Sequence, residues 1–169
     1  MIRKPEALIC RGSGAKTQGR KFLSESCCSD FKGSLMKHIH VACAIIELEG
    51  KVLCTQRSDS MNMPLKWEFP GGKIDEGESP QECLKRELHE ELGIEASVGQ
   101  SLAATTYHYP SFSVTLYHFI CEIVSGEITL HEHSAMVWLP VEELHNLDWA
   151  DADWPVIEEY RRQFDRTKV

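Results

Sequence analysis

Three glutamates within five residues, Glu87, Glu90 and Glu91, constrain this chain more than any other feature. At the spacing i, i+3 and i+4 they share one face of a helix, where like charges repel one another and cost roughly a few tenths of a kcal/mol per pair. A helix that needed only stability would carry Lys or Arg among them. Three converging carboxylates instead form an all-oxygen site suited to Mg²⁺, with Mn²⁺ as the alternative.

The residues around these glutamates predict where the helix begins and ends. Ser79 can cap a helix, Pro80 suits a first turn, and Gly93 is a common residue just after a last turn. The sequence therefore predicts a helix from about Ser79 to Leu92. Beside its acidic face lies a stripe of leucines at i, i+4 and i+8 that would anchor the helix to a sheet: Leu84, Leu88 and Leu92.

The rest of the chain has the pattern of strands with two further helices. Apolar or alternating segments predict strands over residues 38–48, 51–57, 67–69, 101–108, 113–123, 127–130 and 136–139. Segments 141–145 and 154–164 predict a short helix and a terminal amphipathic one. This order predicts an α+β domain with helices packed on one mixed sheet. Gly71 and Gly72 are expected in a loop whose backbone can approach a metal or a phosphate.

Charge divides the chain into a basic leader and an acidic body. Residues 1–35 carry a net charge of +4 without a continuous apolar stretch, so we expect a dispensable extension before a domain over residues 36–169. A transit peptide and a misassigned start before Met36 are the alternatives. The remainder carries −12, which argues against binding to a nucleic-acid polymer. No apolar run approaches the ~18 residues that span a membrane.

The cysteines indicate a reducing compartment. Their number is odd, and no two of them form a CxxC pair that would suggest zinc or redox chemistry. We therefore expect free, mostly buried thiols in a cytoplasmic protein. The seven positions are Cys10, Cys27, Cys28, Cys43, Cys54, Cys83 and Cys121.

The segment 72–94 resembles the Nudix box, the signature of the Nudix hydrolases. That signature is Gly, five residues, Glu, seven residues, Arg-Glu-aliphatic, one residue, Glu-Glu, one residue, Gly-aliphatic. Every fixed position is matched, by Gly72, Glu78, Arg86, Glu87, Leu88, Glu90, Glu91, Gly93 and Ile94. Segments 38–57 and 67–73 resemble the MutT-like branch, which includes 8-oxo-dGTP diphosphatases and CTP pyrophosphohydrolases. The likeness extends over residues 37–162.

The resemblance implies a fold, an activity and a cofactor. The family fold is a mixed sheet between helices, in agreement with the pattern above. The implied reaction splits a nucleoside triphosphate into monophosphate and pyrophosphate with the help of Mg²⁺ or Mn²⁺. A hydrolase of ADP-ribose or of RNA 5′ ends, and a non-enzymatic Nudix sensor, are the alternatives; the MutT-like stretch and the intact box disfavour them. We expect a monomer or homodimer that acts on free nucleotides in support of DNA repair.

The resemblance also assigns roles at the metal. Glu87, Glu90 and Glu91 match the family's ligands, together with the backbone carbonyl of Gly71. Arg86 is expected to orient Glu87 by a charge-assisted hydrogen bond. Glu78 is expected to be structural. Glu132 lies where relatives place a further carboxylate, so either Glu87 or Glu132 would deprotonate the attacking water. Its neighbours His131 and His133 are expected on the surface of that loop.

Four further positions are expected to bind the substrate, in addition to Gly72 of the box. Arg57 matches a phosphate-contacting arginine, and Lys73 a basic position beside the glycines. Phe69, like Trp67, either walls the base pocket or packs in the core. Asp153 matches a base-reading position at the start of the last helix, or it merely caps that helix.

The chemistry of Asp153 narrows the choice of base. An ionised carboxylate only accepts hydrogen bonds, so it pairs best with the adjacent N1–H and amino group of guanine. Cytosine offers its amino group alone. The sequence thus favours a guanine nucleotide such as 8-oxo-dGTP, with CTP or a modified dCTP close behind.

Overall fold

A parallel pair of strands, β1 (Lys37–Leu48) and β7 (Phe112–Ser125), forms the centre of the sheet in a computed structural model that describes residues 36–167. The pairing runs from Lys37 opposite Phe112 to Ile46 opposite Cys121. Both strands are rich in β-branched and aromatic residues, which favour a pleated and buried backbone. The expectations for residues 1–35 lie outside the described residues.

The other strands extend this centre by antiparallel pairing. β2 and β4 flank β1, β5 and β6 flank β7, and both β3 and β8 pair with β2. Their bounds are Lys51–Gln56 (β2), Trp67–Glu68 (β3), Gly71–Lys73 (β4), Glu95–Ser101 (β5), Thr105–His108 (β6) and Ala135–Pro140 (β8). One parallel and several antiparallel pairings make the sheet mixed, as the sequence predicted.

Helix α1 (Pro80–Leu92) begins and ends at the predicted residues. The Ser79 hydroxyl accepts a hydrogen bond from the Glu82 amide, and the Glu82 carboxylate accepts one from the Ser79 amide. This reciprocal cap satisfies two amides that a helix start leaves free. Gly93 ends the helix in the left-handed conformation, at φ 68°, which glycine adopts without the strain of a side chain.

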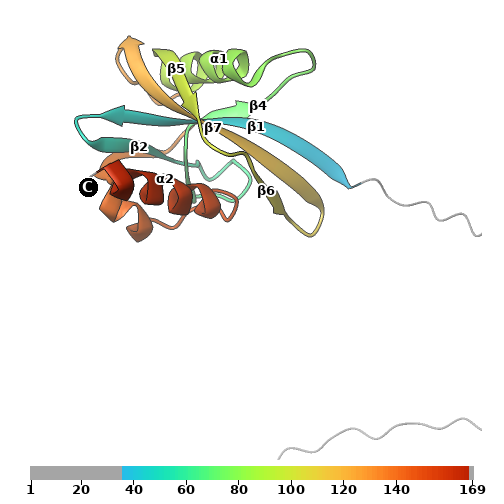
Figure 1. The fold of residues 1–169 in the computed structure, drawn as a ribbon. Helices are drawn as coiled ribbons and strands as arrows, with labels where there is room; N and C mark the ends of the chain where they lie inside the picture. The colour runs from blue at the N-terminus through green and yellow to red at the C-terminus, as the bar shows by residue number, and fades with distance from the viewer. Residues whose placement is uncertain (1–35, 168–169) are drawn as a thin grey trace, which may run out of the picture. The chain divides into compact units, whose positions relative to one another are not determined.

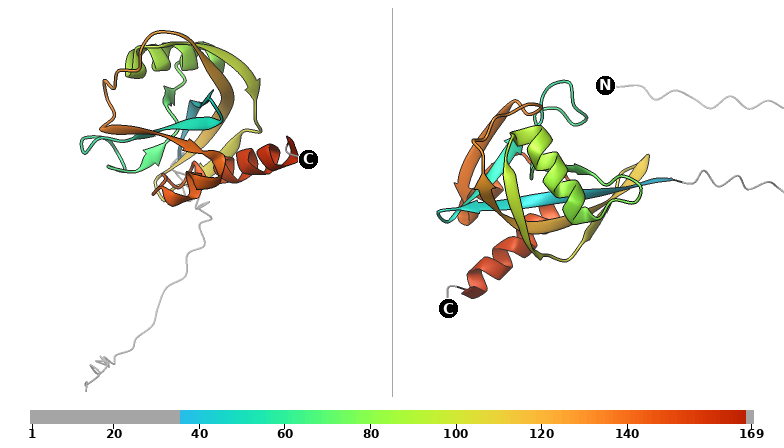
Figure 2. Two further views of the ribbon diagram at one scale, coloured as in Figure 1. Left: turned by 90° about the vertical axis from the view of Figure 1, so that its left-hand side faces the viewer. Right: turned by 90° about the horizontal axis from the view of Figure 1, so that it is seen from above.

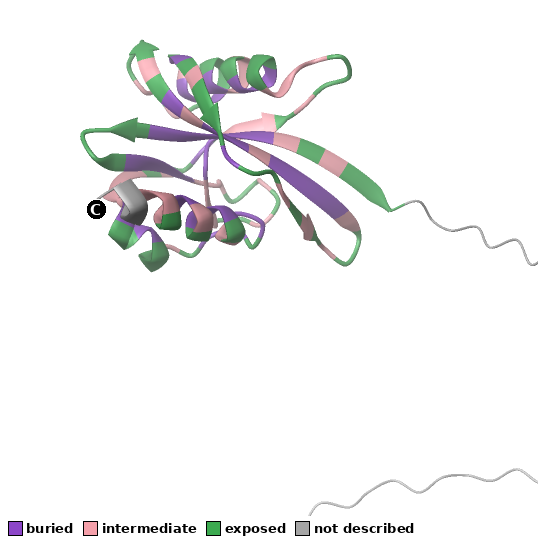
Figure 3. Cartoon of the chain, viewed as in Figure 1, coloured by how far each residue is buried: buried purple, intermediate pink, exposed green. Residues whose placement is uncertain are grey.

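Two apolar cores hold the helices against opposite faces of the sheet (Figures 1 and 2). The leucine stripe of α1 packs on one face, where Leu84, Leu88 and Leu92 are fully buried. Helix α2 (Trp154–Thr167) packs on the other face together with the short 3₁₀ helix η1 (Val141–Asn146). Figure 3 shows the buried residues concentrated in the middle of the sheet and on the inward sides of the helices. The predicted mixed sheet between helices is confirmed.

Three predictions for the backbone were wrong. The predicted strand over 101–108 is interrupted: β5 ends at Ser101, β6 begins at Thr105, and the pairing of β5 with β7 shifts between Val98 and Ser101. Most of β5 was missed because its sequence is polar and only partly buried. The expected loop at Gly71 and Gly72 is instead strand β4, paired with β1.

The predicted strand over residues 127–130 does not form. Its backbone groups bond to the end of α1: the Thr129 amide donates to the carbonyl of Leu92 over 2.9 Å, and the His131 amide to that of Glu91 over 3.0 Å. The last carbonyls of a helix have no partner within the helix. The helix carbonyls therefore bind amides that a strand would otherwise use. Residues 126–134 run along the end of α1, and we call this segment the strap.

Two smaller expectations can be compared with the described part of the chain. Cys43, Cys54, Cys83 and Cys121 are buried free thiols, as predicted. No helix in residues 36–167 is long and apolar enough to cross a membrane.

Candidate active site

The two glycines of β4 bring the sheet directly under the acidic face of α1. Gly71 pairs with Cys43 of β1 at φ 146°, and a Cβ there would lie 2.1 Å from the carbonyl oxygen of Ala42. A Cβ on Gly72 would lie 2.2 Å from the carboxylate carbon of Glu87. At Gly71 only glycine fits, because a side chain would push the strand away from the backbone of β1, whereas a side chain at Gly72 would displace the Glu87 carboxylate.

Glu91 is the most buried acid of the helix face, 5% exposed. Its carboxylate accepts a hydrogen bond of 3.2 Å from the Gly71 amide, which links the helix to β4. Burial raises the pKa of Glu91 to about 8, and the nearby charges of Glu68, Glu87 and Glu132 act in the same direction. The fold therefore brings more carboxyl groups together here than a helix would tolerate for stability alone.

Arg86 holds the acids beside Glu91. Its Nε and Nη2 each donate to Glu78 over 2.9 Å, and its Nη1 donates to Glu87 over 2.8 Å and to Glu90 over 3.3 Å. The hydrogen bonds from Arg86 lower the pKa of Glu78 to about 2. Burial raises the pKa of Glu87, and Arg86 opposes that rise. Arg86 thus fixes Glu78 as its bidentate partner and steadies Glu87 toward Gly72.

The strap after β7 carries Glu132 to the acidic face. His131 Nδ1 donates to the carbonyl of Glu90 over 2.7 Å, which adds to its amide bond with Glu91. Glu132 itself is exposed, and its charge raises the pKa of both Glu87 and Glu91. The strap therefore places this fourth carboxylate over the same patch.

The expectation that His133 lies on the loop surface was wrong. Its side chain is 1% exposed, and Nε2 donates to Glu68 over 3.1 Å. The other oxygen of Glu68 pairs with Arg57, whose Nε also donates to the carbonyl of Asn62. Sequence reasoning missed Glu68 and His133 as site residues. The partners stand 65 positions apart, and the only signal was an acid inside the segment 67–73.

These residues have the chemistry of a divalent-cation site. Glu87, Glu90, Glu91 and Glu132 supply carboxylate oxygens, and the Gly71 carbonyl is a further hard donor. Within residues 36–167, no three Cys, His, Asp or Glu side chains are close enough to form a ready-made metal cluster, and Glu87 and Glu91 are instead bonded to Arg86 and the Gly71 amide. The surplus of partly buried negative charge fits a cation, which would offset it.

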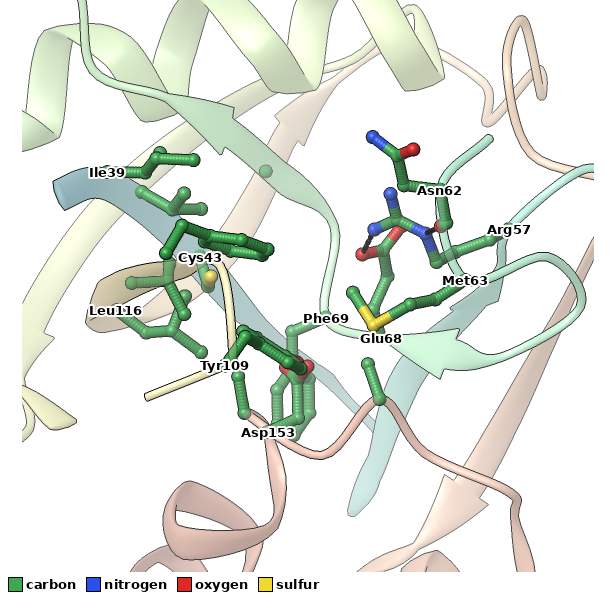
Figure 4. Close-up of a pocket in the computed structure, with 16 residues that line it drawn as sticks. Ile39, Cys43, Arg57, Asn62, Met63, Glu68, Phe69, Tyr109, Leu116 and Asp153 are labelled. Atoms are coloured by element: carbon green, nitrogen blue, oxygen red, sulfur yellow. Dashed lines mark hydrogen bonds and ion pairs between the residues drawn. The ribbon is translucent and has the colours of Figure 1, made fainter. Parts of the chain in front are cut away.

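An apolar cavity of about 190 Å³ runs from Gly71 toward the start of α2 (Figure 4). Of the expected substrate residues, Arg57, Phe69 and Asp153 line it, whereas Gly72 and Lys73 do not. The backbone carbonyl of Lys73 accepts a hydrogen bond from Arg86, whereas its side chain is exposed and could contact a ligand. The lining also includes Glu68 and Tyr109, which the sequence did not single out.

Asp153 is a buried acid at the end of this cavity, 5% exposed. Its carboxylate accepts a hydrogen bond from the Phe69 amide. Burial raises the pKa of Asp153 well above its usual range, and the charge of Glu68 adds to this, while the Phe69 amide and Arg57 oppose it. Phe69 is 2% exposed and packs against Trp149 and His118, so it belongs both to the core and to the cavity wall.

The chain is similar to known proteins in both sequence and fold. The model of the NUDIX domain matches residues 36–160. The CTP pyrophosphohydrolase of Escherichia coli (strain K12) is 40% identical over 125 residues, which cover 74% of this chain and 93% of that protein. An 8-oxo-dGTP diphosphatase of the same organism is 34% identical over 128 residues, covering 75% and 99%.

Solved structures show the same similarity. The solution structure of the E. coli ORF135 protein is 39% identical, with a TM-score of 0.65 over 74% of this chain and 89% of that one. The crystal structure of a MutT protein from Methanosarcina mazei Go1 is 26% identical, with a TM-score of 0.69 over 76% and 96%.

Proposed function

The chain belongs to the NUDIX family, and from this membership we propose that it is a hydrolase that converts a nucleoside triphosphate and water into the nucleoside monophosphate and pyrophosphate. One observation carries the proposal. The acidic face of α1 and the apolar cavity meet at Gly71, so a site for phosphates and a site for a base are adjacent. A nucleotide needs these two environments side by side.

Nudix hydrolases generally need a divalent cation, and we propose Mg²⁺, with Mn²⁺ as a substitute. Glu87, Glu90, Glu91, Glu132 and the Gly71 carbonyl would hold it. When bound, the cation neutralises phosphate charge and lowers the pKa of a water molecule. The four carboxylates explain how so acidic a protein accepts an anionic substrate, because their charge is then balanced.

The chain's own residues then bind the substrate and move the proton. Arg86 fixes the Glu87 carboxylate, and either Glu87 or Glu132 accepts the proton of the attacking water. The water oxygen bonds to the β-phosphorus as the bond from that phosphorus to the α–β bridging oxygen breaks, and the monophosphate leaves. Arg57 at the cavity edge and the exposed Lys73 would contact the phosphates.

Asp153 would read the base while Phe69 forms a wall beside it. The burial of Asp153 changes the preference derived from its sequence position. A neutral carboxyl group donates one hydrogen bond and accepts another. It therefore pairs with the N3 acceptor and the amino group of cytosine, which an ionised carboxylate pairs with poorly. We place a cytosine nucleotide first, as the name of the 40% identical relative suggests.

An oxidised guanine nucleotide is the second candidate. The 8-oxo-dGTP diphosphatases among the relatives favour it, as does the match of an ionised Asp153 with guanine. Either substrate would be a free nucleotide, with removal of damaged precursors as a DNA-repair role. The four buried free thiols support a reducing cytoplasm as the location. We propose a monomer or homodimer.

A nucleotide panel with Mg²⁺ tests this function, with pyrophosphate release read as phosphate after added pyrophosphatase. We expect CTP, modified dCTP or 8-oxo-dGTP to be the best substrate. Asp153→Ala should lower kcat/KM for that nucleotide by roughly 10- to 100-fold and barely change poor substrates. A uniform loss would mean that Asp153 only supports α2. Turnover of ADP-ribose or capped RNA alone would refute the proposed substrate class.

A further inference from the structure

Tyr109 is a cavity residue to which the proposed reaction has so far given no role. It lies in the turn between β6 and β7, where its amide donates to the carbonyl of Phe112 over 2.8 Å. Its ring packs between Tyr107 and Phe112, with centroid separations of 4.7 Å on each side. These contacts fix the ring, so the position of the hydroxyl is set before any ligand binds.

The hydroxyl of Tyr109 is buried, and its proton has no acceptor among the described residues, whereas its oxygen faces the Ala152 amide. Figure 4 shows the ring extending toward Asp153. Burial raises the pKa of Tyr109, the Ala152 amide opposes this rise, and the nearby charge of Asp153 adds to it. Native proteins rarely leave a buried hydroxyl unpaired, because it loses water without gaining a partner. In a residue that lines a cavity, such a group indicates a ligand atom that completes the pair.

The neighbouring Asp153 limits what that ligand atom can be. If Asp153 pairs with two adjacent groups on the edge of a base, the next group along that edge would lie beside the Tyr109 hydroxyl. In cytosine this group is the O2 carbonyl beside N3, and in guanine it is the O6 carbonyl beside N1–H. Adenine has no carbonyl oxygen. A tyrosine O–H can donate to a carbonyl oxygen. Adenine has a C–H where cytosine and guanine have that oxygen, so the hydroxyl would stay unpaired.

Resting on the proposed function, we propose that the Tyr109 hydroxyl donates a hydrogen bond to a ring carbonyl oxygen of the bound base. It thereby selects cytosine and guanine nucleotides against adenine nucleotides. Asp153 decides between cytosine and guanine according to whether it carries a proton, while Tyr109 rejects adenine in either case. Tyr109 and Asp153 thus divide the recognition of the base between them.

The test compares kcat/KM for CTP, 8-oxo-dGTP and ATP in the full chain and in Tyr109→Phe. The variant lacks only the hydroxyl and keeps the ring packing. We expect kcat/KM to fall about tenfold for the better of CTP and 8-oxo-dGTP, as for one neutral hydrogen bond, and to stay unchanged for ATP. The loss should appear mainly in KM, since the hydroxyl would contact the base and not the reacting phosphates. Tyr107→Phe is the matched control, because its ring packs on Tyr109 but does not line the cavity.

The outcomes separate this inference from the function on which it rests. An unchanged ratio of CTP or 8-oxo-dGTP to ATP in Tyr109→Phe, with the wild type active, overturns the role of Tyr109 alone. Equal losses in Tyr107→Phe and Tyr109→Phe also overturn it, because packing would then explain both. A folded wild type that prefers ATP overturns the inference and leaves a triphosphate hydrolase. A wild type inactive on every nucleotide overturns both.

Discussion

The carboxylate of Glu91 combines two costs that a folded protein normally avoids. It is buried, and it lies among the charges of Glu68, Glu87 and Glu132, so its pKa is raised to about 8. Each of these conditions disfavours the charged form. A site that carries such a cost in the free protein is suited to bind a cation, which would stabilise the charged form of Glu91.

Replacing Glu91 with glutamine separates the charge of this side chain from its hydrogen bond to Gly71. Glu91→Gln keeps the shape and an acceptor for the Gly71 amide, but it removes the charge. We expect kcat to fall by at least roughly 10²-fold, as when charge stabilisation is lost at a phosphoryl centre. The metal-free melting temperature should not fall, because a destabilising buried acid has been removed. Steady-state kinetics and thermal melts in EDTA measure both.

Glu95→Gln is the matched control for this change. It removes an exposed carboxylate just after the same helix, in a residue paired with His89. It should leave kcat within a factor of about two. A folded Glu91→Gln variant with near-wild-type turnover would refute the assignment of the metal site.

His118 is a second residue whose burial has a measurable consequence. It is fully buried, neither ring nitrogen has a hydrogen-bond partner among the described residues, and burial lowers its pKa from 6.5 to about 3. Between these values the unfolded chain binds a proton that the folded chain does not. Folding stability must therefore decline as the pH falls below about 6.5.

Replacement of His118 by methionine should remove this dependence. We expect the free energy of unfolding of the wild type to drop by about 1.4 kcal/mol more per pH unit than that of His118→Met between pH 6 and 4.5. Urea unfolding in EDTA measures the two slopes, with the exposed His145→Met as control. Parallel slopes for wild type and His118→Met would show that the ring is protonated in the folded protein.

For single residues, the sequence predicted the positions that follow from the regular repeat of one helix. Glu87, Glu90 and Glu91 could be placed on one face because a helix repeats regularly. The partnership of Glu68 with His133, and the unpaired hydroxyl of Tyr109, could not be predicted, since they depend on how distant segments fold together. The pKa of Asp153 belongs with these, because burial is a tertiary property.

Among the elements, the strap over residues 126–134 links helix α1 to strand β3. Its amides bond to the last carbonyls of α1, and His133 fixes its far end to Glu68 of β3. Between these attachments Glu132 is held over the acidic face. The strand predicted there from residues 127–130 fails for the same reason, since the pattern of side chains does not reveal that helix carbonyls compete for the amides.

His133 should act on catalysis through the position of Glu132. His133→Leu removes the hydrogen bond to Glu68, and we expect kcat to fall roughly tenfold with a weaker apparent affinity for Mg²⁺. His133→Gln, which retains an N–H near the same place, should recover most of the loss. In a Glu132→Gln background, His133→Leu should add little.

Full additivity of the two changes would contradict this role. Residues that act through one another show strongly non-additive effects, whereas independent residues do not. Magnesium titrations of the four proteins of the cycle, with kcat as the readout, distinguish the two cases.

For the whole molecule, residues 36–167 contain both cores and every site residue. We therefore predict that a variant starting at Met36 melts within a few degrees of the full chain and keeps its kcat and KM. The comparison of thermal melts and kinetics is direct. A large loss of stability or activity would show that residues 1–35 pack on the domain, against the expectation from their sequence.

The α+β class and the order of most elements could be predicted, because caps, alternating strands and the leucine stripe are local signals that agree with one another. β4 could not, since its two glycines are recognisable as a strand only through their fit against β1 and Glu87. That same fit joins the acidic face to the cavity.

We propose that the junction of the acidic face and the cavity cleaves a nucleoside triphosphate between its α- and β-phosphates. Phosphorus NMR of CTP and of 8-oxo-dGTP, each incubated with the protein and Mg²⁺, follows every phosphorus atom during turnover. For at least one of them we predict that the triphosphate signals give way to a nucleoside monophosphate and pyrophosphate in equal amounts, and that EDTA abolishes the conversion. Release of inorganic phosphate with a nucleoside diphosphate, or unchanged triphosphates with a folded protein, would contradict the proposed cleavage.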